Sequence, residues 1–174
     1  MKAISLWQPW ASLIACGAKR IETRSRITNY RGELAIHAAK TTEPWIDELI
    51  NESPFRESLE DAISGLSVYA GNRLLSVAAQ RKLPLGVIVA TCRLVECRKI
   101  ADPDGYTPKV SAEGRVLGAV PFYVNDTERI FGDFTPGCYA WIVTDIKPLA
   151  EPILAKGKPG LWEWIPPAGF EVSR

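Results

Sequence analysis

Hydrophobic and polar residues alternate at the start of the chain. In KAISLW, residues 2–7, Ile4 and Leu6 fall on one side of an extended backbone, and Ser5 and Trp7 fall on the other. A period of two is typical of a half-buried strand. The pattern therefore predicts that the chain begins with a strand.

The spacing then changes to that of a short helix. Trp10, Leu13 and Ile14 recur at intervals of three and four residues, which places them on one apolar stripe. Pro9 suits the first turn of this helix, and Gly17 suits its C-terminal end.

A highly charged strand is predicted directly after this helix. RIETRS, residues 20–25, returns to a period of two. Ile21 and Thr23 take one face, and Glu22 and Arg24 take the opposite face. The next segment, RGELAIHAA (31–39), predicts a second strand that has one apolar face and one polar face.

The middle of the chain has a different character. Residues 41–83 have helical composition and spacing, and they predict a helical insertion into the domain. Residues 83–100 form a β-rich run whose start we expect to be buried on both faces. Residues 101–130 contain Asp-Pro, Asp-Gly and isolated prolines, which predict a long loop or lid. Strong strand patterns return at 137–149 and at the start of 151–167.

The order of these elements predicts the fold class. Strands do not alternate regularly with helices, so a doubly wound sheet is disfavoured. We predict an α+β fold, a mixed or antiparallel β-barrel with short helices and a helical insertion at about 41–83. The length of 174 residues favours one domain that covers residues 1–174.

Composition narrows the class of protein. Apolar residues make up 47% and charged residues 24%, as in globular proteins, and no apolar stretch is long enough to span a membrane. The four cysteines form no C-x-x-C pair and the chain has one histidine, so we expect neither a metal site nor a cofactor. The start MKAISLWQPW breaks at Gln8-Pro9 before a signal sequence forms, and we expect a cytoplasmic location.

The charges are unevenly distributed although the net charge is only +1. Residues 17–40 have a net charge of +4, whereas residues 43–61 have a net charge of −6. This contrast indicates two different faces. One hypothesis is therefore an interaction module that uses the acidic helices at 43–63 as its partner surface.

The strongest candidate site consists of Lys19, Glu22 and Arg24. Glu22 and Arg24 share a strand face, and Lys19 lies in the turn that leads into the strand. A carboxylate between two cations stays ionised and can accept hydrogen bonds from an amino or amide group. The alternative is a solvated surface ladder of ion pairs, worth about 1 kcal/mol or less per pair.

Other side chains could contact a nucleic acid or nucleotide. Trp7 and Trp10 could stack a base and Gln8 could read its edge, although core packing is the alternative for tryptophan. Basic or pocket-lining roles are the hypotheses for five further residues, with solvent exposure or a structural role as the alternative: Arg31, His37, Lys40, Lys156 and Lys158.

Several of these segments resemble the ASCH domain family, which shares the PUA-like barrel. The family motif G-x-K-x-x-E-x-R is matched by Gly17, Lys19, Glu22 and Arg24. The upstream QPWASL is similar to the subgroup related to the ASCH module of transcription coactivators. LGVIVATCRLVEC resembles the central strand of the family, and CYAWIVTDIKPLAEPILAKGKPGLWEW resembles its closing strands.

The resemblance implies a cleft beside the first helix that holds RNA, single-stranded DNA, or a nucleoside or nucleotide. It places Lys19, Glu22 and Arg24 on the cleft floor. Some relatives are hydrolases of N4-acylcytidine-type nucleosides and others are ribonucleases, so Lys19 and Glu22 are also candidate catalytic residues. The threonine that the amidohydrolases use as nucleophile is replaced by Glu22, and Thr23 is one residue away. The sequence sets no oligomeric state.

Overall fold

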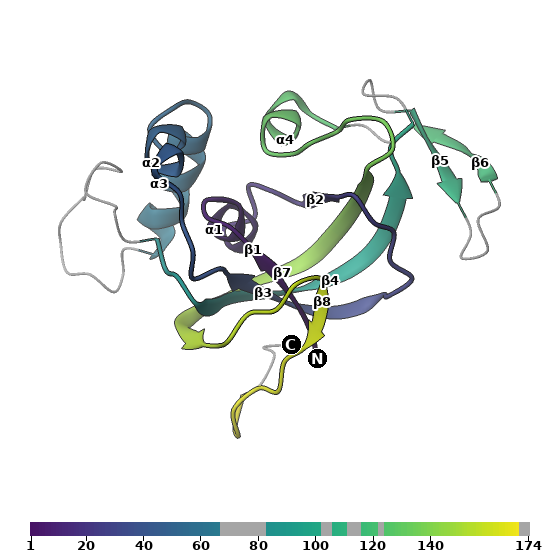
Figure 1. Cartoon of the computed structure of the whole chain (residues 1–174). Helices are drawn as coiled ribbons and strands as arrows, with labels where there is room; N and C mark the ends of the chain where they lie inside the picture. Colours follow the sequence, from purple (N-terminus) through teal and green to yellow (C-terminus); the bar gives the residue numbers. More distant parts are fainter. Residues whose placement is uncertain (67–82, 102–105, 111–115, 122–123, 171–174) are drawn as a thin grey trace. The chain divides into compact units, whose positions relative to one another are not determined.

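The structure is a computed structural model that describes residues 1–66, 83–101, 106–110, 116–121 and 124–170 (Figure 1). It contains two compact units. Unit 1 comprises Met1–Ala18, Glu33–Cys92 and Asp145–Arg174, and unit 2 comprises Lys19–Gly32 and Arg93–Thr144.

Unit 1 contains a mixed sheet. Its strands follow the order β7 (Tyr139–Leu154), β4 (Val87–Lys99), β3 (Gly32–Ala38), β1 (Lys2–Leu6) and β8 (Leu161–Glu163). β1 pairs in parallel with β3, with Ile4 opposite Ile36, and antiparallel with β8, with Ala3 opposite Trp162. β4 and β7 also run into unit 2.

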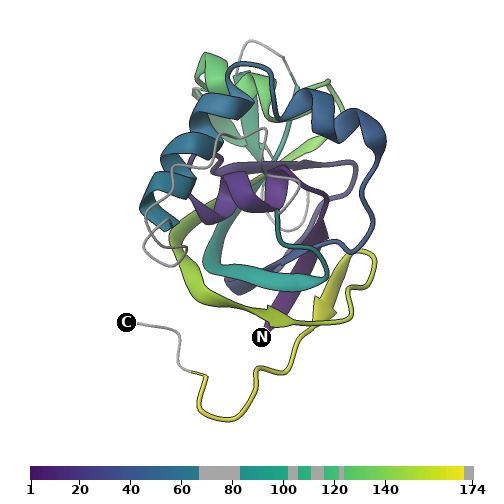
Figure 2. The same cartoon turned by 90° about the vertical axis from the view of Figure 1, so that its left-hand side faces the viewer.

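The described residues of unit 1 form three helices, which lie close to one another in both cartoon views (Figure 2). The predicted first helix is confirmed as α1, Trp10–Ala15, and it packs against α3, Phe55–Leu66. Gly17 follows α1 with a φ of 82°, a backbone conformation that favours glycine. The helical prediction for 41–83 is matched by α2, Pro44–Leu49, and by α3, whereas residues 67–82 lie outside the described residues.

The core of unit 1 explains one wrong expectation about β3. The strand was predicted to have a polar face, yet its residues from Leu34 to Ala38 are all buried. Ala35 belongs to a core cluster with Trp162 and Trp164, which cover the face that was expected to be polar. The prediction that β4 is buried on both faces at its start is confirmed, because its first six residues are all buried.

Unit 2 contains the charged strand. β2, Ile21–Arg24, pairs antiparallel with the start of β7, with Glu22 opposite Trp141, and β7 in turn neighbours β4. A helix, α4, spans Asp126–Ile130. Two further strands, β5 (Tyr106–Val110) and β6 (Val116–Pro121), form a separate antiparallel hairpin (Figure 1).

The predicted α+β class is confirmed, because short helices accompany a mixed sheet. Two local predictions differ from the structure. The segment 101–130 contains β5, β6 and α4. Pro108 and Gly118 lie inside these strands, so the loop-like composition hid them. The strand expected at 151 is the continuation of β7, which bends through Asp145 at a φ of 51°. No helix in the described part of the chain has the length and apolar character needed to cross a membrane.

Candidate functional site

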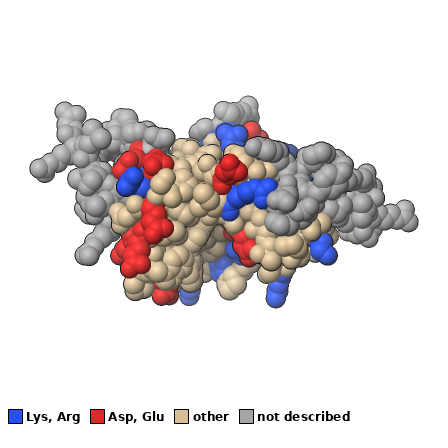
Figure 3. Space-filling model, turned by 90° about the horizontal axis from the view of Figure 1, so that it is seen from above, with Lys and Arg blue, Asp and Glu red and all other residues tan. Residues whose placement is uncertain are grey.

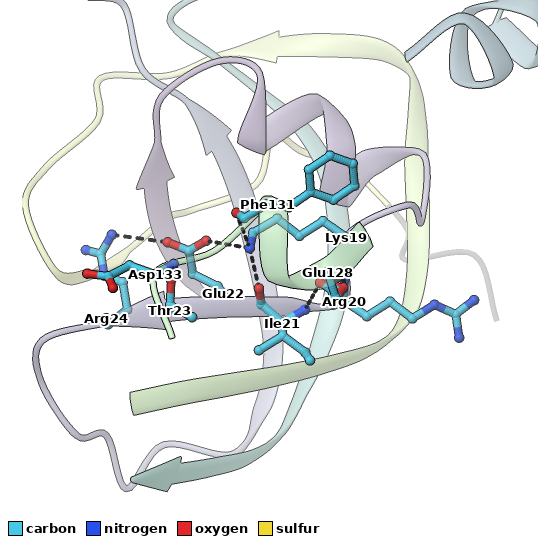
Figure 4. Close-up of polar contacts among 9 residues, drawn as sticks. All are labelled: Lys19, Arg20, Ile21, Glu22, Thr23, Arg24, Glu128, Phe131 and Asp133. Atoms are coloured by element: carbon cyan, nitrogen blue, oxygen red, sulfur yellow. Dashed lines mark hydrogen bonds and ion pairs between the residues drawn. The ribbon is translucent and has the colours of Figure 1, made fainter. Parts of the chain in front are cut away.

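Lys19 is the most deeply buried charged residue of the predicted trio. Its side chain is 0% exposed, immediately before β2. Nζ donates hydrogen bonds to the main-chain oxygens of Ile21 and Phe131, the latter at 2.9 Å, and lies 3.8 Å from a carboxylate oxygen of Glu22 (Figure 4). Lys19, which was expected on the floor of a cleft, is fully buried, and main-chain oxygens satisfy its amine.

Glu22 and Arg24 share a face of β2, as their spacing predicted. The Glu22 carboxylate lies 3.8 Å from Lys19 Nζ and 3.5 Å from Arg24 Nη1. Its side chain remains 13% exposed and that of Arg24 31% exposed. The carboxylate thus links a buried cation to a cation that solvent reaches.

The sequence analysis missed Glu128, a buried residue of α4. Its carboxylate accepts hydrogen bonds from the main-chain N–H groups of Arg20, at 2.8 and 3.0 Å, and Ile21, at 2.9 Å. The Asn125 side chain caps α4 by accepting a hydrogen bond from Glu128 N at 2.7 Å. The pattern Asn-x-x-Glu is a helix-start signal, so the helix was detectable from the sequence, although the destination of the glutamate was not.

Thr23 faces away from Glu22, toward the segment that follows α4. Its hydroxyl oxygen accepts a hydrogen bond from Asp133 N at 2.8 Å. A Cβ atom at Gly132 would lie 3.1 Å from Thr23 Cγ2, so Gly132 lies directly against the Thr23 side chain. The sequence prediction that Thr23 lies opposite Glu22 agrees with this contact.

The buried groups have shifted proton affinities. Burial lowers the pKa of Lys19, although the carboxylates of Glu22 and Glu128 act in the opposite direction. Burial raises the pKa of Glu22 despite the nearby charges of Lys19 and Arg24, and it also raises the pKa of Glu128. Burial thus favours the neutral form of each group, while the opposite charges nearby favour the charged form.

Basic side chains of unit 2 extend outward around this buried group. Arg20 and Arg26 are exposed, and the Arg20 side chain points away from Lys19 and Glu22 (Figure 4). The exposed Arg31 uses Nη1 to donate hydrogen bonds to the main-chain oxygens of Thr28 at 2.9 Å and Tyr30 at 2.7 Å. These two bonds fix the orientation of the Arg31 guanidinium group.

Gln8, which was expected to face a groove, is buried in unit 1. Nε2 donates to the main-chain oxygen of Pro84 at 2.9 Å, and Oε1 accepts from Ser12 N at 3.2 Å. The amide thus ties the start of α1 to the segment before β4. Both ends of the side chain are used within the protein.

Trp7 and Trp10 belong to an aromatic cluster in unit 1. The Trp7 ring lies 6.2 Å from that of Trp45, and the Trp10 ring lies 6.0 Å from Trp45 and 6.4 Å from Phe55. Trp7 and Trp45 are exposed, whereas Phe55 is buried. The sequence analysis did not single out Trp45, because a lone tryptophan in a helical segment gives no sign of its exposure.

His37 is a buried structural residue in this arrangement. Nε2 lies 3.1 Å from the main-chain oxygen of Ala155, Nδ1 lies 3.1 Å from Ser5 Oγ, and the ring packs edge-on to Trp162 at 5.7 Å. Gly157 lies so close that a Cβ atom there would meet the imidazole. The lone imidazole therefore lines no open pocket among the described residues.

The three remaining predicted lysines, Lys40, Lys156 and Lys158, are exposed in unit 1. The main-chain oxygen of Lys158 accepts a hydrogen bond from Ser5 Oγ at 3.1 Å, so the loop that carries Lys156 and Lys158 is held to β1. The structure thus brings Lys19, Glu22 and Arg24 together in unit 2. Of the candidates in unit 1, Trp7 and Trp10 share one aromatic cluster, whereas Gln8 and His37 are buried in contacts with other segments. Within the described residues, no three His, Cys, Asp or Glu side chains are grouped so that they could hold a metal ion.

Comparison with known proteins identifies the family to which the chain belongs. No curated protein sequence matches the chain significantly. A crystal structure of ASCH from Zymomonas mobilis is similar, with a TM-score of 0.45 and 17% sequence identity over 95% of this chain and 87% of that one. The sequence model of the ASCH domain matches residues 4–147, most of the chain and all of the charged motif, and the protein therefore belongs to the ASCH domain family.

Proposed function

We propose that the protein binds single-stranded nucleic acid, RNA in the first place, or a nucleotide, through the surface of unit 2 around β2. The ASCH family and its PUA-like fold suggest nucleic-acid binding in general. The observation that carries the proposal is the partly exposed Glu22 carboxylate, which lies between Lys19 and Arg24. A fixed carboxylate accepts hydrogen bonds from the amino group of a base, and an adjacent guanidinium suits a phosphate.

The charge around β2 supports this proposal. Within residues 20–31, Glu22 is the one acidic residue, and it is accompanied by four arginines. These arginines are exposed or partly exposed on unit 2: Arg20, Arg24, Arg26 and Arg31. Contacts to phosphate fix a strand without reading its sequence, and their strength falls as salt is added.

Burial gives Lys19 a positioning role in this proposal. Its amine is satisfied by Ile21, Phe131 and Glu22, so it holds the carboxylate in place and does not touch phosphate. Trp45 lies on the acidic helix α2 and pairs with Trp7, and this setting does not suit phosphate. The proposed nucleic-acid site therefore leaves Trp7 and Trp45 out.

A binding experiment tests the proposal. Fluorescein-labelled single-stranded RNA is titrated with the wild type and with Arg24→Ala/Arg31→Ala at two salt concentrations. We expect the double variant to bind at least about tenfold more weakly and to show a shallower salt dependence, because two phosphate contacts are lost. Lys147→Ala is the control, since it removes a cation from unit 1. Equal affinity of the wild type and the double variant would refute the proposed site.

A hydrolase acting on a modified nucleoside is a second candidate, favoured by one observation. Burial raises the pKa of Glu22, and a carboxyl group with a raised pKa is suited to proton transfer near neutral pH. Lys19, the expected oxyanion donor, is already bonded to Ile21 and Phe131, which weakens this candidate. Turnover of an N4-acylcytidine and of RNA is compared between the wild type and Glu22→Gln. If both proteins turn over either substrate equally fast, Glu22 has no catalytic role.

Three broader proposals accompany this function. Residues 1–174 form a single ASCH domain with an inserted helical segment at 41–83, because the family match extends over both units. The segment QPWASL supports membership of the subgroup similar to the coactivator modules. The four free cysteines, of which Cys92 and Cys97 are buried, support a reducing, cytoplasmic location.

A further inference from the structure

Two exposed tryptophans form a pair on unit 1 that the proposed nucleic-acid site does not use. Trp7 is 43% exposed and Trp45 is 46% exposed, and their ring centroids lie 6.2 Å apart at an interplanar angle of 45°. Exposed large aromatic side chains that touch each other are typical of binding surfaces.

The partly buried Trp10 and the buried Phe55 hold this pair in place. The Trp10 ring contacts Trp45 at 6.0 Å and packs edge-on against Phe55 at 6.4 Å and 86°. Phe55 is buried at the start of α3, so the exposed rings rest on the core. A pre-positioned aromatic surface loses little conformational entropy when a partner binds.

The helices beside the pair are strongly acidic. Figure 3 shows acidic side chains gathered over α2 and α3. Within residues 43–60, Arg56 is the one basic residue, and it lies 3.8 Å from Glu57. In the described part of the chain, no ion pair engages the other acidic side chains of this segment, which are Glu43, Asp47, Glu48, Glu52 and Glu60.

The acidic charge and the aromatic pair meet on α2. Trp45 and Glu48 are three residues apart on this helix, a spacing that places them on neighbouring positions of its surface. A cation that stacks on the Trp45 ring can therefore also pair with a carboxylate. The ring face attracts cations, and the carboxylates repel phosphate.

We propose that Trp7, Trp45 and the acidic surface of α2 and α3 form a docking site for a lysine- and arginine-rich segment of a partner protein. Its guanidinium or apolar side chains stack on the two rings, and its charges pair with the unpaired carboxylates of 43–60. The charge complementarity selects this partner over a nucleic acid. The proposal goes beyond the function assigned to β2 and does not depend on it.

The test uses the full chain and two fluorescein-labelled peptides. One peptide is rich in arginine and leucine, and the other has glutamate in place of every arginine. Binding is measured by fluorescence anisotropy for the wild type, Trp45→Ala and Glu48→Lys. We expect the arginine peptide alone to bind, and each substitution to weaken it at least about tenfold. Added salt should weaken the binding further, since charge pairs contribute to it.

Matched controls distinguish binding at this surface from non-specific binding elsewhere on the protein. Leu154→Ala removes another exposed apolar side chain of unit 1, and Glu151→Lys reverses another exposed acidic one; neither should change the affinity. Circular dichroism confirms that each variant is folded, and Glu48→Lys tests the surface without removing a ring.

Three outcomes would overturn the proposal: neither peptide binds, the glutamate peptide binds equally well, or the controls weaken binding as much as Trp45→Ala. A fourth is that Trp45→Ala weakens binding of single-stranded RNA, which would assign the tryptophans to nucleic acid. Loss of RNA binding in Arg24→Ala/Arg31→Ala is an independent result, so the two proposals can fail separately.

Discussion

The amine nitrogen of Lys19 lies 2.9 Å from the main-chain oxygen of Phe131, a residue 112 positions further along the chain. This contact joins the charged motif to the end of α4. Glu128 of the same segment binds the main-chain N–H groups at the start of β2. Two sets of hydrogen bonds, from Lys19 and to Glu128, therefore join the charged motif to α4 and its C-terminal end.

The burial of Lys19 predicts that its amine matters for stability. Lys19→Met keeps the approximate length of the side chain but removes the amine. The main-chain oxygens of Ile21 and Phe131 then lose the hydrogen bond that Lys19 donates to them. Since each unsatisfied buried polar group costs about 1–3 kcal/mol, we expect the free energy of unfolding to fall by about 2–4 kcal/mol. Urea denaturation measures this loss. Lys40→Met, at an exposed position, should change stability by less than about 0.5 kcal/mol; a similar change in both variants would contradict the role of Lys19.

Glu128 should be needed for the geometry of β2. Glu128→Gln keeps one acceptor but loses the charge that strengthens the hydrogen bonds from Arg20 N and Ile21 N. Charge-assisted hydrogen bonds contribute about 1.5–3 kcal/mol, so we expect a loss of about 1–2 kcal/mol in unfolding free energy. Amide hydrogen exchange at Arg20 and Ile21 should also become faster. Glu151→Gln is the matched control at an exposed position, and slow exchange in Glu128→Gln would show that the carboxylate is dispensable.

Stability should depend on the protonation of His37. Burial lowers the pKa of His37 from 6.5, with the hydrogen bond to Ala155 acting in the opposite direction. The unfolded chain therefore binds a proton more readily than the folded one, and stability falls as the pH drops below about 6.5, by at most about 1.4 kcal/mol per pH unit. Denaturation of the wild type and of His37→Gln between pH 8 and pH 5 isolates this contribution.

The carboxyl groups of Glu22 and Glu128 make stability depend on pH in the opposite direction. Burial raises the pKa of Glu22 and of Glu128 from 4.5, so their contribution to stability falls as the pH rises above 4.5. The difference between the wild type and His37→Gln cancels these carboxyl contributions. We expect this difference to shrink toward low pH; parallel stability curves would rule out a titrating His37.

Gly157 should tolerate no side chain. A Cβ atom there would contact the His37 ring and lie 2.8 Å from Ser5 Oγ. Gly157→Ala must therefore displace the loop or the imidazole, and overpacking of this kind costs about 1–3 kcal/mol. Thermal unfolding of Gly157→Ala measures the effect, and Lys156→Ala, next in the chain and exposed, serves as the control. An unchanged melting temperature would show that this loop is free to move away.

The alternation of residues predicted the strands well. Glu22 and Arg24 were placed on one face and Thr23 on the other, because a period of two determines faces without any tertiary information. The structure agrees, with Glu22 beside Arg24 and Thr23 bonded to Asp133.

The depth of the charged residues could not be predicted in the same way. The acceptors of Lys19 are main-chain oxygens, which any residue at positions 21 and 131 provides, so the sequence contains no sign of them. Lysine is almost never fully buried unless it is paired, so the residue type also gave no sign of a fully buried amine. The burial of His37 was missed for a similar reason. The residue that covers it, Trp162, comes from a strand far away in the sequence.

The link between Lys19 and Phe131 also determines when the site can form as the protein is synthesised. Lys19 leaves the ribosome long before Phe131 and Glu128, and before the segment of β7 that pairs with β2. Until those residues emerge, the lysine has no buried acceptors and remains hydrated, like any basic side chain of an unfolded segment. The nascent chain therefore carries the motif in a solvated form. A transcript truncated before α4 would yield a polypeptide that has every residue of the motif but lacks the contacts to Glu128 and Phe131.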